Sequence, residues 1–315
     1  MATAAAPSPS LPAYARRFTG ETLSIHEWSC PGHEACGVEE AGDAFEVVVP
    51  RRGRFLREVG GRTELADRGS VSFYHPGEPY RVRHPAPGGD SGTIFRLDPL
   101  AAAELVGAHD RAAADRAVLR FPGVRALIDG PAYLRHLLAI RSVDAALAGP
   151  LETEERAVAF LHGVLRQARE QKGGSPARDR AVRNRHAVEY AERVREVVGR
   201  RYREPISLAE VSRAVGASPF HLSRLVTAAT GVSIYRMVTR LRLRDALEQL
   251  LATREHLTAI ALSVGYGSHS RFTEAFRREF GLTPSELRRS AASSGPAGRS
   301  PRSPAPASKM RPRWQ

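Results

Sequence analysis

The sequence predicts an α+β protein of two domains, with a sheet-rich first domain and an all-helical second domain. From about Phe18 to Leu97 the apolar residues come in short runs between turn-forming residues, a pattern typical of strands. Beyond Pro99 the apolar residues recur at spacings of three and four, which is typical of helices. A length of 315 residues is enough for two ordinary domains.

Composition narrows the class of protein. With 42% hydrophobic and 26% charged residues, the chain can build folded cores and is neither disordered nor fibrous. No stretch approaches the roughly 18 apolar residues of a membrane helix, and the N-terminus lacks the basic start and apolar stretch of a signal peptide. We therefore expect a cytoplasmic protein with no membrane partner. Two cysteines exclude a disulfide-based scaffold.

Residues 14–170 form the predicted first domain. Three apolar runs in it are expected as strands: FEVVV at 45–49, FLREV at 55–59 and SVSFY at 70–74. A turn is expected at Gly53, between the first two runs. Short strands with turns every 8 to 12 residues or so are typical of an antiparallel sandwich or barrel. Helices are expected over 100–119 and 151–170, where apolar residues follow a helical spacing.

A linker and a helical second domain follow. Residues 171–180 contain Gly-Gly-Ser-Pro, which ends a helix and is flexible. Residues 181–290 form the predicted second domain, and its expected helices are 184–201, 207–215, 218–228, 233–252, 257–264, 268–279 and 283–290. Residues 1–13 and the tail 291–315 have few large apolar side chains and are expected to be disordered.

The positive charge is concentrated in the second half. Residues 1–180 hold 23 Lys and Arg against 23 Asp and Glu, residues 181–290 hold 19 against 11, and residues 291–315 hold five against none. A neutral front and a basic back indicate that the second domain meets a polyanion while the first does something else.

Residues 207–235 and 257–285 repeat each other. At an offset of 49, Leu208, Val211, Ser212 and Gly216 match Leu257, Ile260, Ala261 and Gly265. At an offset of 50, Ser218, Leu222, Val226, Gly231 and Ser233 match Ser268, Phe272, Phe276, Gly281 and Thr283. The extra residue falls in the turn, where an insertion is easily absorbed.

Each copy has the pattern of a helix-turn-helix. A small residue, Ser212 or Ala261, lets the second helix cross the first closely, and the following glycine supplies the positive φ of a tight turn. Ser218 or Ser268 then caps the second helix. The second helices, about 218–228 and 268–279, are the predicted recognition helices. Their outward, DNA-facing side chains are expected to be Phe220, His221, Ser223, Arg224, His269, Ser270, Arg271, Thr273 and Glu274.

Residues 186–290 resemble the DNA-binding domain of the AraC/XylS family of bacterial transcription regulators. The segments that carry the resemblance are SLAEVSRAVGASPFHLSRL, TGVS and LTAIALSVGYGSHSRFTEAFRREFGLTPSELR. The resemblance implies two helix-turn-helix units joined by a long helix at about 233–252. Ser212 replaces a usual Ala, which we expect to be harmless. Glu274 stands where a basic residue is common, which leaves open what the second unit reads; a glutamate can accept a hydrogen bond from a cytosine amino group.

The resemblance also implies a cupin-like barrel in the first domain, where family members sense a small molecule or dimerise. Residues 69–84, GSVSFYHPGEPYRVRH, resemble two strands of such a barrel and the Pro-Gly turn between them. Metal-binding cupins have a histidine at the position of Tyr80, so a cupin metalloenzyme is not expected. Five residues are candidates for an effector pocket, although aromatic residues in strands are more often core: Phe55, Phe73, Tyr80, Arg81 and His84.

The segment CPGHEAC holds Cys30, His33 and Cys36, whose side chains are soft metal ligands at close spacing. His26, His75 and His84 are candidates for a fourth ligand. The plainer interpretation is a turn with two thiols and a surface histidine, and we predict no metal and no cofactor. DNA-repair methyltransferases with a similar DNA-binding domain need more cysteines than two.

Together these patterns predict a sequence-specific DNA-binding transcription regulator that is not an enzyme. Its expected partners are double-stranded DNA, a small-molecule effector, a second copy of the chain in a homodimer and, for an activator, RNA polymerase. The alternative is a DNA-targeted enzyme, or a thiol- or metal-dependent repair or redox protein, that uses Cys30, His33 and Cys36.

Overall fold

The computed structural model describes residues 12–32, 36–84, 88–114, 117–144, 149–172 and 185–293. Most of the expected linker and almost all of both expected disordered ends lie outside the described residues. The last helix ends at Ser293, three residues beyond the predicted boundary at residue 290.

The first half is built on a nine-stranded antiparallel sheet, which confirms a sheet-rich N-terminal part. Its strands are β1 (Ala13–Thr19), β2 (Leu23–Cys30), β3 (Glu39–Ala41), β4 (Phe45–Val59), β5 (Arg62–Asp67), β6 (Ser70–Tyr74), β7 (Pro79–Arg83), β8 (Asp90–Leu97) and β9 (Arg125–Leu127). The order along the main path is β1-β2-β8-β4-β6-β9; β5 and β7 pair with β4, and β3 pairs with β7.

The sheet is open in the part of the chain that the structure describes. Strands β1 and β9 stand at the two ends of the main path. The closed barrel that the cupin resemblance implies is therefore not confirmed.

One predicted turn is wrong, because the runs at 45–49 and 55–59 belong to the single strand β4. Its first part pairs with β6 and β8, and its second part pairs with β5 and β7. The change of partners follows a register shift between Pro50 and Arg52, and Gly53 has a φ of 67°. A Cβ on Gly53 would lie 2.0 Å from the carbonyl oxygen of Gly89, so this glycine permits a close crossing instead of a reversal.

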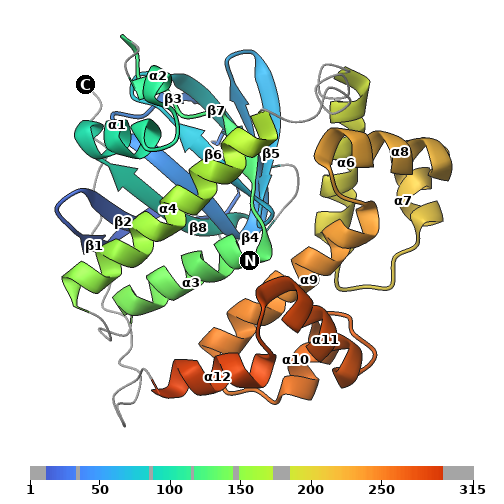
Figure 1. Cartoon of the computed structure of the whole chain (residues 1–315). Helices are drawn as coiled ribbons and strands as arrows, with labels where there is room; N and C mark the ends of the chain where they lie inside the picture. The colour runs from blue at the N-terminus through green and yellow to red at the C-terminus, as the bar shows by residue number, and fades with distance from the viewer. Residues whose placement is uncertain are drawn as a thin grey trace, which may run out of the picture.

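Helices cover one face of the sheet. These are α1 (Pro99–Gly107), α2 (Arg111–Ala114), α3 (Gly130–Asp144) and α4 (Pro150–Lys172), so the single helix expected over 100–119 is two short ones. Figure 1 shows α3 and α4 lying across the sheet. The apolar stripe predicted on α4 is buried: Phe160 and Val164 are fully covered and pack in one core with Phe73 and Phe95 of the sheet.

The second half is entirely helical in its described part. Its helices are α6 (Arg185–Arg201), α7 (Leu208–Val215), α8 (Pro219–Thr230), α9 (Ile234–Ala252), α10 (Leu257–Ser263), α11 (His269–Phe280) and α12 (Pro284–Ser293). All seven predicted helices are present. Figure 1 shows α9 joining the group α6–α8 to the group α10–α12. None of the described helices has the length and hydropathy to cross a lipid bilayer.

The two helical groups pack differently against the rest of the molecule. The group α6–α8 and the start of α9 have a core of their own, which includes Val194, Leu222 and Val226. The core of α10–α12, which includes Phe272 and Phe276, is continuous with the core of the first half. Helix α3 makes this junction, because it contacts both α9 and α11.

Candidate nucleic-acid interface

Both repeats fold as the sequence predicts, because the turn and cap residues are where the backbone needs them. Gly216 and Gly265 have φ values of 71° and 88°, in the left-handed region that favours glycine. The Ser218 hydroxyl accepts a hydrogen bond from the backbone N–H of His221 at 3.4 Å, and Ser268 does the same for Arg271 at 3.2 Å. Local signals thus place the start of α8 and of α11.

Matching positions in the two repeats are buried in the same way. The inward anchors of the recognition helices, Leu222 with Val226 and Phe272 with Phe276, are fully covered. The small residues Ser212 and Ala261 are also buried, as a close helix crossing requires. The buried Ser212 hydroxyl has no hydrogen-bond partner among the described residues. Such a group costs folding free energy, so serine is less favourable than alanine at this position.

The first recognition helix, α8, presents most of its predicted residues to solvent. Phe220 is 92% exposed, and His221 and Arg224 are also exposed, whereas Ser223 is half-buried. A phenylalanine this exposed at the start of a helix offers an apolar contact of the kind that a thymine methyl group makes with proteins. Helix α8 therefore displays one apolar and two basic or hydrogen-bonding groups side by side.

The second recognition helix, α11, presents His269, Ser270, Arg271 and Glu274, with Thr273 half-buried. The Glu274 carboxylate pairs with Arg278, one turn further on, at 2.5 Å. Both side chains are largely exposed, and a pair of this kind contributes about 0.3–0.5 kcal/mol, so it opens at little cost. Glu274 is thus partly neutralised and still free to meet a base edge.

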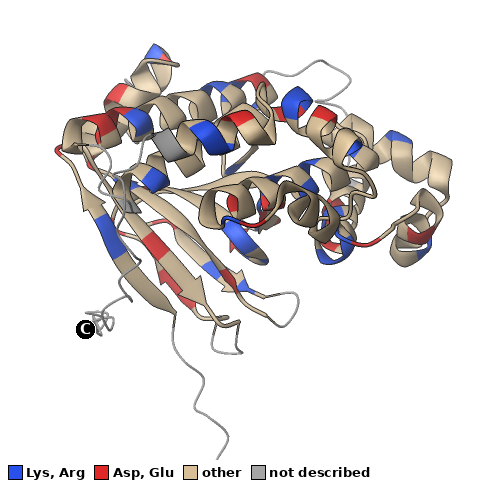
Figure 2. Cartoon of the chain, turned by 90° about the horizontal axis from the view of Figure 1, so that it is seen from below, with Lys and Arg blue, Asp and Glu red and all other residues tan. Residues whose placement is uncertain are grey.

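Each of the two helices also offers its N-terminus to the same candidate interface. A helix N-terminus carries partial positive charge and backbone N–H groups, which favour phosphate. Figure 2 shows basic and acidic positions on the helices of both halves and on the sheet.

Two exposed residues at the start of α9 were missed by the sequence reasoning. Tyr235 is 80% exposed and Arg236 is exposed. They follow the cap residue Ser233, whose hydroxyl accepts a hydrogen bond from the backbone N–H of Arg236. Their position in the helical repeat could have predicted their exposure. Tyr235 lies off the buried stripe that Ile234, Met237 and Leu241 form.

The five residues predicted to line an effector pocket are not all brought together. Phe73 lies in the main core against Phe121, whereas Phe55 packs against Trp28 in a separate cluster that also holds Tyr80. Arg81 is exposed and pairs with Glu39, and the His84 ring binds the Asp90 carboxylate. Alternate residues of a strand point to opposite faces, which separates residues that are close in sequence.

A large cavity lies elsewhere, between the two halves. Its volume is about 1090 Å³, and its walls come from β4, β5, β8, α3, α6, α9 and the segments that follow β5 and α6. Seven of the residues around it are arginines: Arg51, Arg52, Arg54, Arg68, Arg141, Arg200 and Arg203. Three are acidic: Asp67, Asp245 and Glu248. No local pattern predicted it, because distant segments of both halves have to pack before the cavity exists.

The cysteine pair predicted from the CPGHEAC segment is close in space. The sulfur atoms of Cys30 and Cys36 are 3.3 Å apart, and both cysteines are free thiols. His33 lies outside the described residues. Burial raises the pKa of the Cys30 thiol to about 12, the opposite of what a redox-reactive thiolate needs.

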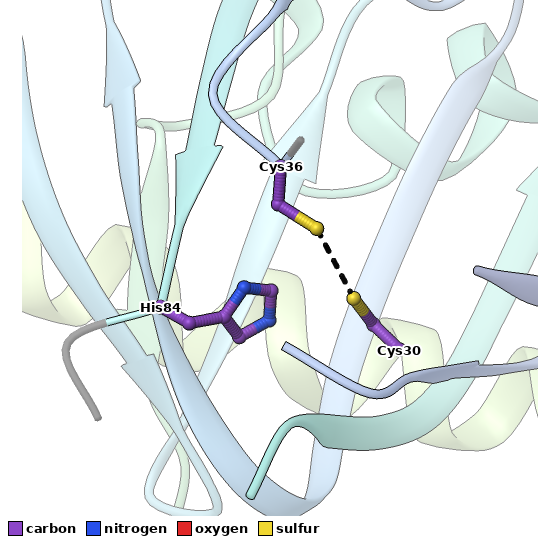
Figure 3. A group of neighbouring side chains, drawn as sticks. All are labelled: Cys30, Cys36 and His84. Atoms are coloured by element: carbon purple, nitrogen blue, oxygen red, sulfur yellow. Dashed lines mark hydrogen bonds between the residues drawn. The ribbon is translucent and has the colours of Figure 1, made fainter. Parts of the chain in front are cut away.

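Of the three histidines considered as a fourth ligand, two lie away from the cysteines and one lies beside them. His26 is hydrogen-bonded to Ser24, and the His75 ring pairs with Glu78, so neither joins the cysteines. The imidazole of His84 does, as Figure 3 shows.

Two capped recognition helices, each set on a glycine turn and displaying polar side chains, define a tandem helix-turn-helix domain of the kind that reads DNA. A family model described as a helix-turn-helix domain matches residues 211–290. The SoxS regulatory protein of Salmonella typhimurium is 32% identical over 85 residues, which cover 27% of this chain and 79% of that protein. The chain belongs to the AraC/XylS family of transcription regulators.

Two further proteins show how far the similarity extends. The transcriptional regulator GlxA of Rhizobium meliloti is 28% identical over 130 residues, which cover 41% of this chain and 39% of GlxA. A crystal structure of a probable AraC family regulator from Rhodopseudomonas palustris is 28% identical, with a TM-score of 0.31, and covers 33% of this chain and 97% of that one. This chain thus spans about four tenths of the length of GlxA.

Proposed function

We propose that this protein is a sequence-specific DNA-binding transcription regulator that reads DNA with α8 and α11. The observation that carries the proposal is the repeated geometry: two recognition helices with the same cap, turn and buried anchors, each with its polar face exposed. The residues that we propose to reach DNA are those predicted from the sequence: Phe220, His221, Ser223, Arg224, His269, Ser270, Arg271, Thr273 and Glu274. Tyr235 and Arg236 join them as candidates for backbone contacts.

The length of α9 fits two neighbouring major grooves. Its 19 residues span about 28 Å at a rise of 1.5 Å per residue. Recognition helices that bind on one face of the duplex stand one turn apart, about 34 Å. A single chain can therefore occupy two successive grooves, and a homodimer would occupy two such pairs.

We propose that the cavity between the halves is the effector site, in place of the pocket predicted from the sequence. Its arginines outnumber its acidic residues, and Arg54 makes no salt bridge among the described residues, although the charges of Glu196 and Asp67 act on it from further away, so the site favours an organic anion. Residues of β4 face α6 and α9 across it, so an anion that binds there alters how the first half holds the recognition units.

Four further properties of the protein are part of the proposal. A cupin-like origin of the sheet, a homodimer, contact with RNA polymerase and a cytoplasmic location all go with the proposed function. The relatives are described as transcriptional regulators, which favours a regulator over an enzyme.

Truncation of Arg224 tests the proposed reading. With an operator selected from random DNA, Arg224→Ala in the full chain should bind about 1–3 kcal/mol more weakly, because a guanine or phosphate contact is lost while the core is untouched. Arg166→Ala is the matched control, since Arg166 is an exposed arginine of α4 in the first half. Affinities are measured by fluorescence anisotropy at one fixed salt concentration.

Two results would bear on the assignment. An Arg224→Ala protein that binds the operator as tightly as the control does would remove Arg224 from the interface. An equal loss on operator and random DNA would make it a phosphate contact without a part in specificity.

A further inference from the structure

We propose that Cys30, Cys36 and His84 bind a zinc ion in the first half of the protein, a site independent of DNA reading. One ligand atom from each of the three residues lies within 4.8 Å of the others. Figure 3 shows the imidazole ring facing the two sulfur atoms. Two thiolates and an imidazole are a typical zinc donor set.

The fold brings these residues together from separate strands. Cys30 ends β2 opposite Asp90, the first residue of β8, and His84 follows the end of β7. A Cβ on Gly89 would lie 1.9 Å from the carbonyl oxygen of Cys30, so only glycine lets the β7–β8 connection approach the cysteine this closely. The close approach at Gly89 therefore brings the β7–β8 connection next to Cys30.

His84 is prepared as a metal ligand. Its side chain is 6% exposed, and its Nε2 is hydrogen-bonded to the Asp90 carboxylate. The second ring nitrogen, Nδ1, is buried and has no hydrogen-bond partner among the described residues. When Nε2–H donates to Asp90, Nδ1 keeps its lone pair for an ion.

The carboxylate behind the histidine is itself held in place. The indole Nε1–H of Trp28 donates to Asp90 Oδ1 at 2.5 Å, while Asp90 Oδ2 binds His84. A carboxylate on the outer nitrogen of a metal-bound histidine fixes the ring orientation and raises its basicity. Trp28 and Asp90 are thus positioning residues for His84.

The distance between the sulfur atoms suits an ion after a small movement. Two thiolates bound to zinc at about 2.3 Å in a tetrahedron are roughly 3.8 Å apart, against 3.3 Å between the free thiols. Cys36 is half-buried and its side chain can rotate, which supplies the difference. The three described ligands leave the fourth tetrahedral position to water or another donor.

The sequence alone did not favour this site, because the third ligand is far from the cysteines along the chain. Neither His26 nor His75, its rivals as a ligand, lies in the cluster. The role that follows is structural. An ion here ties the ends of β2 and β7 to the segment that carries Cys36, so it stabilises this edge of the sheet.

The test is metal binding by the full chain. Protein produced with zinc in the medium and purified under reducing conditions should hold one zinc per chain. Titration of the metal-free protein with Co²⁺ should give a thiolate-to-cobalt charge-transfer absorption. Cys36→Ser and Cys30→Ser should abolish the absorption, and Asp90→Asn should weaken affinity about 10–100-fold.

Controls separate a site from a general effect on folding. His26→Gln should bind zinc as the unchanged chain does, because His26 lies outside the cluster. His84→Gln should lose at least as much affinity as Asp90→Asn while its circular dichroism matches that of the metal-free protein. The proposal is overturned if the reduced chain holds no zinc and gives no cobalt absorption. It is also overturned if the two cysteines of the native protein form a disulfide, or if His84→Gln binds as tightly as His26→Gln.

Discussion

His136 lies fully buried among the rings of Phe95, Tyr133 and Phe160. Neither of its ring nitrogens has a hydrogen-bond partner in the described part of the chain. Burial lowers the pKa of His136 well below 6.5, and the charge of Arg51 lowers it further. The folded protein therefore keeps this imidazole neutral while the unfolded chain takes up a proton below about pH 6.5.

Replacement of this histidine should flatten the pH dependence of stability. The unfolded state binds the extra proton, so stability is full at pH 7 and falls as the pH drops below about 6.5. His136→Leu removes the effect, which amounts to at most about 1.4 kcal/mol per pH unit. Urea unfolding at pH 7, 6 and 5, followed by tryptophan fluorescence, measures it. The same slope in both proteins would show that His136 is protonated in the fold.

The buried hydroxyl of Ser212 gives a second residue-scale prediction. It is covered and has no hydrogen-bond partner, so Ser212→Ala should raise the free energy of unfolding by about 1 kcal/mol. Ser142→Ala is the matched control, because the Ser142 hydroxyl is also buried but donates to the carbonyl of Leu138 or Ala139. The control should be destabilised. Equal effects of the two changes would mean that the Ser212 hydroxyl has a partner.

At the scale of elements, the two turn glycines are equivalent in conformation and differ in surroundings. Both have left-handed φ values, but a Cβ on Gly265 would lie 2.4 Å from the carbonyl oxygen of Arg203, and a Cβ on Gly216 meets no atom within 4 Å. Gly265→Ala should therefore destabilise by about 1–3 kcal/mol more than Gly216→Ala. Thermal unfolding of the two variants decides this. A larger loss in Gly216→Ala would contradict the close approach of the Arg203 carbonyl to Gly265.

Local signals made the helical half predictable. The caps Ser218 and Ser268, the glycine turns and the paired apolar anchors act within a few residues of themselves, so sequence alone located α8 and α11. The sheet was harder, because the course of β4 through Gly53 depends on a backbone that approaches from elsewhere. The partnership of His84 with the cysteines depends on strand register, which no local pattern encodes.

At the scale of the whole molecule, the two halves are joined by buried polar contacts that the sequence did not indicate. Arg244 of α9 is 1% exposed and donates to the carbonyls of Arg68 and Ile128 in the first half. Burial lowers its pKa to about 10, so it remains charged at neutral pH. Arg141 of α3 donates to the carbonyl of Leu251 at 2.6 Å. The second recognition unit is therefore held directly on the first half.

The way each helix-turn-helix unit is attached to the first half determines how a change in the first half can reach it. The second unit shares a core with the first half, while the first unit has a core of its own and is tied to the first half through α6, where Arg195 pairs with Asp67 and Glu192 with Arg125. A ligand bound in the arginine-lined cavity, as proposed above, would lie where these parts meet. Under the proposed function, such a ligand would change how α6 and α9 are held on the first half.

Footprinting of the full chain on its selected operator tests the central claim most directly. We expect protection of two successive major-groove segments on one face, about one helical turn apart, for each bound chain. Arg224→Ala should weaken protection of one segment, and Arg271→Ala of the other. Protection of a single segment per chain, or loss of the same segment in both variants, would contradict the claim that both helices read DNA.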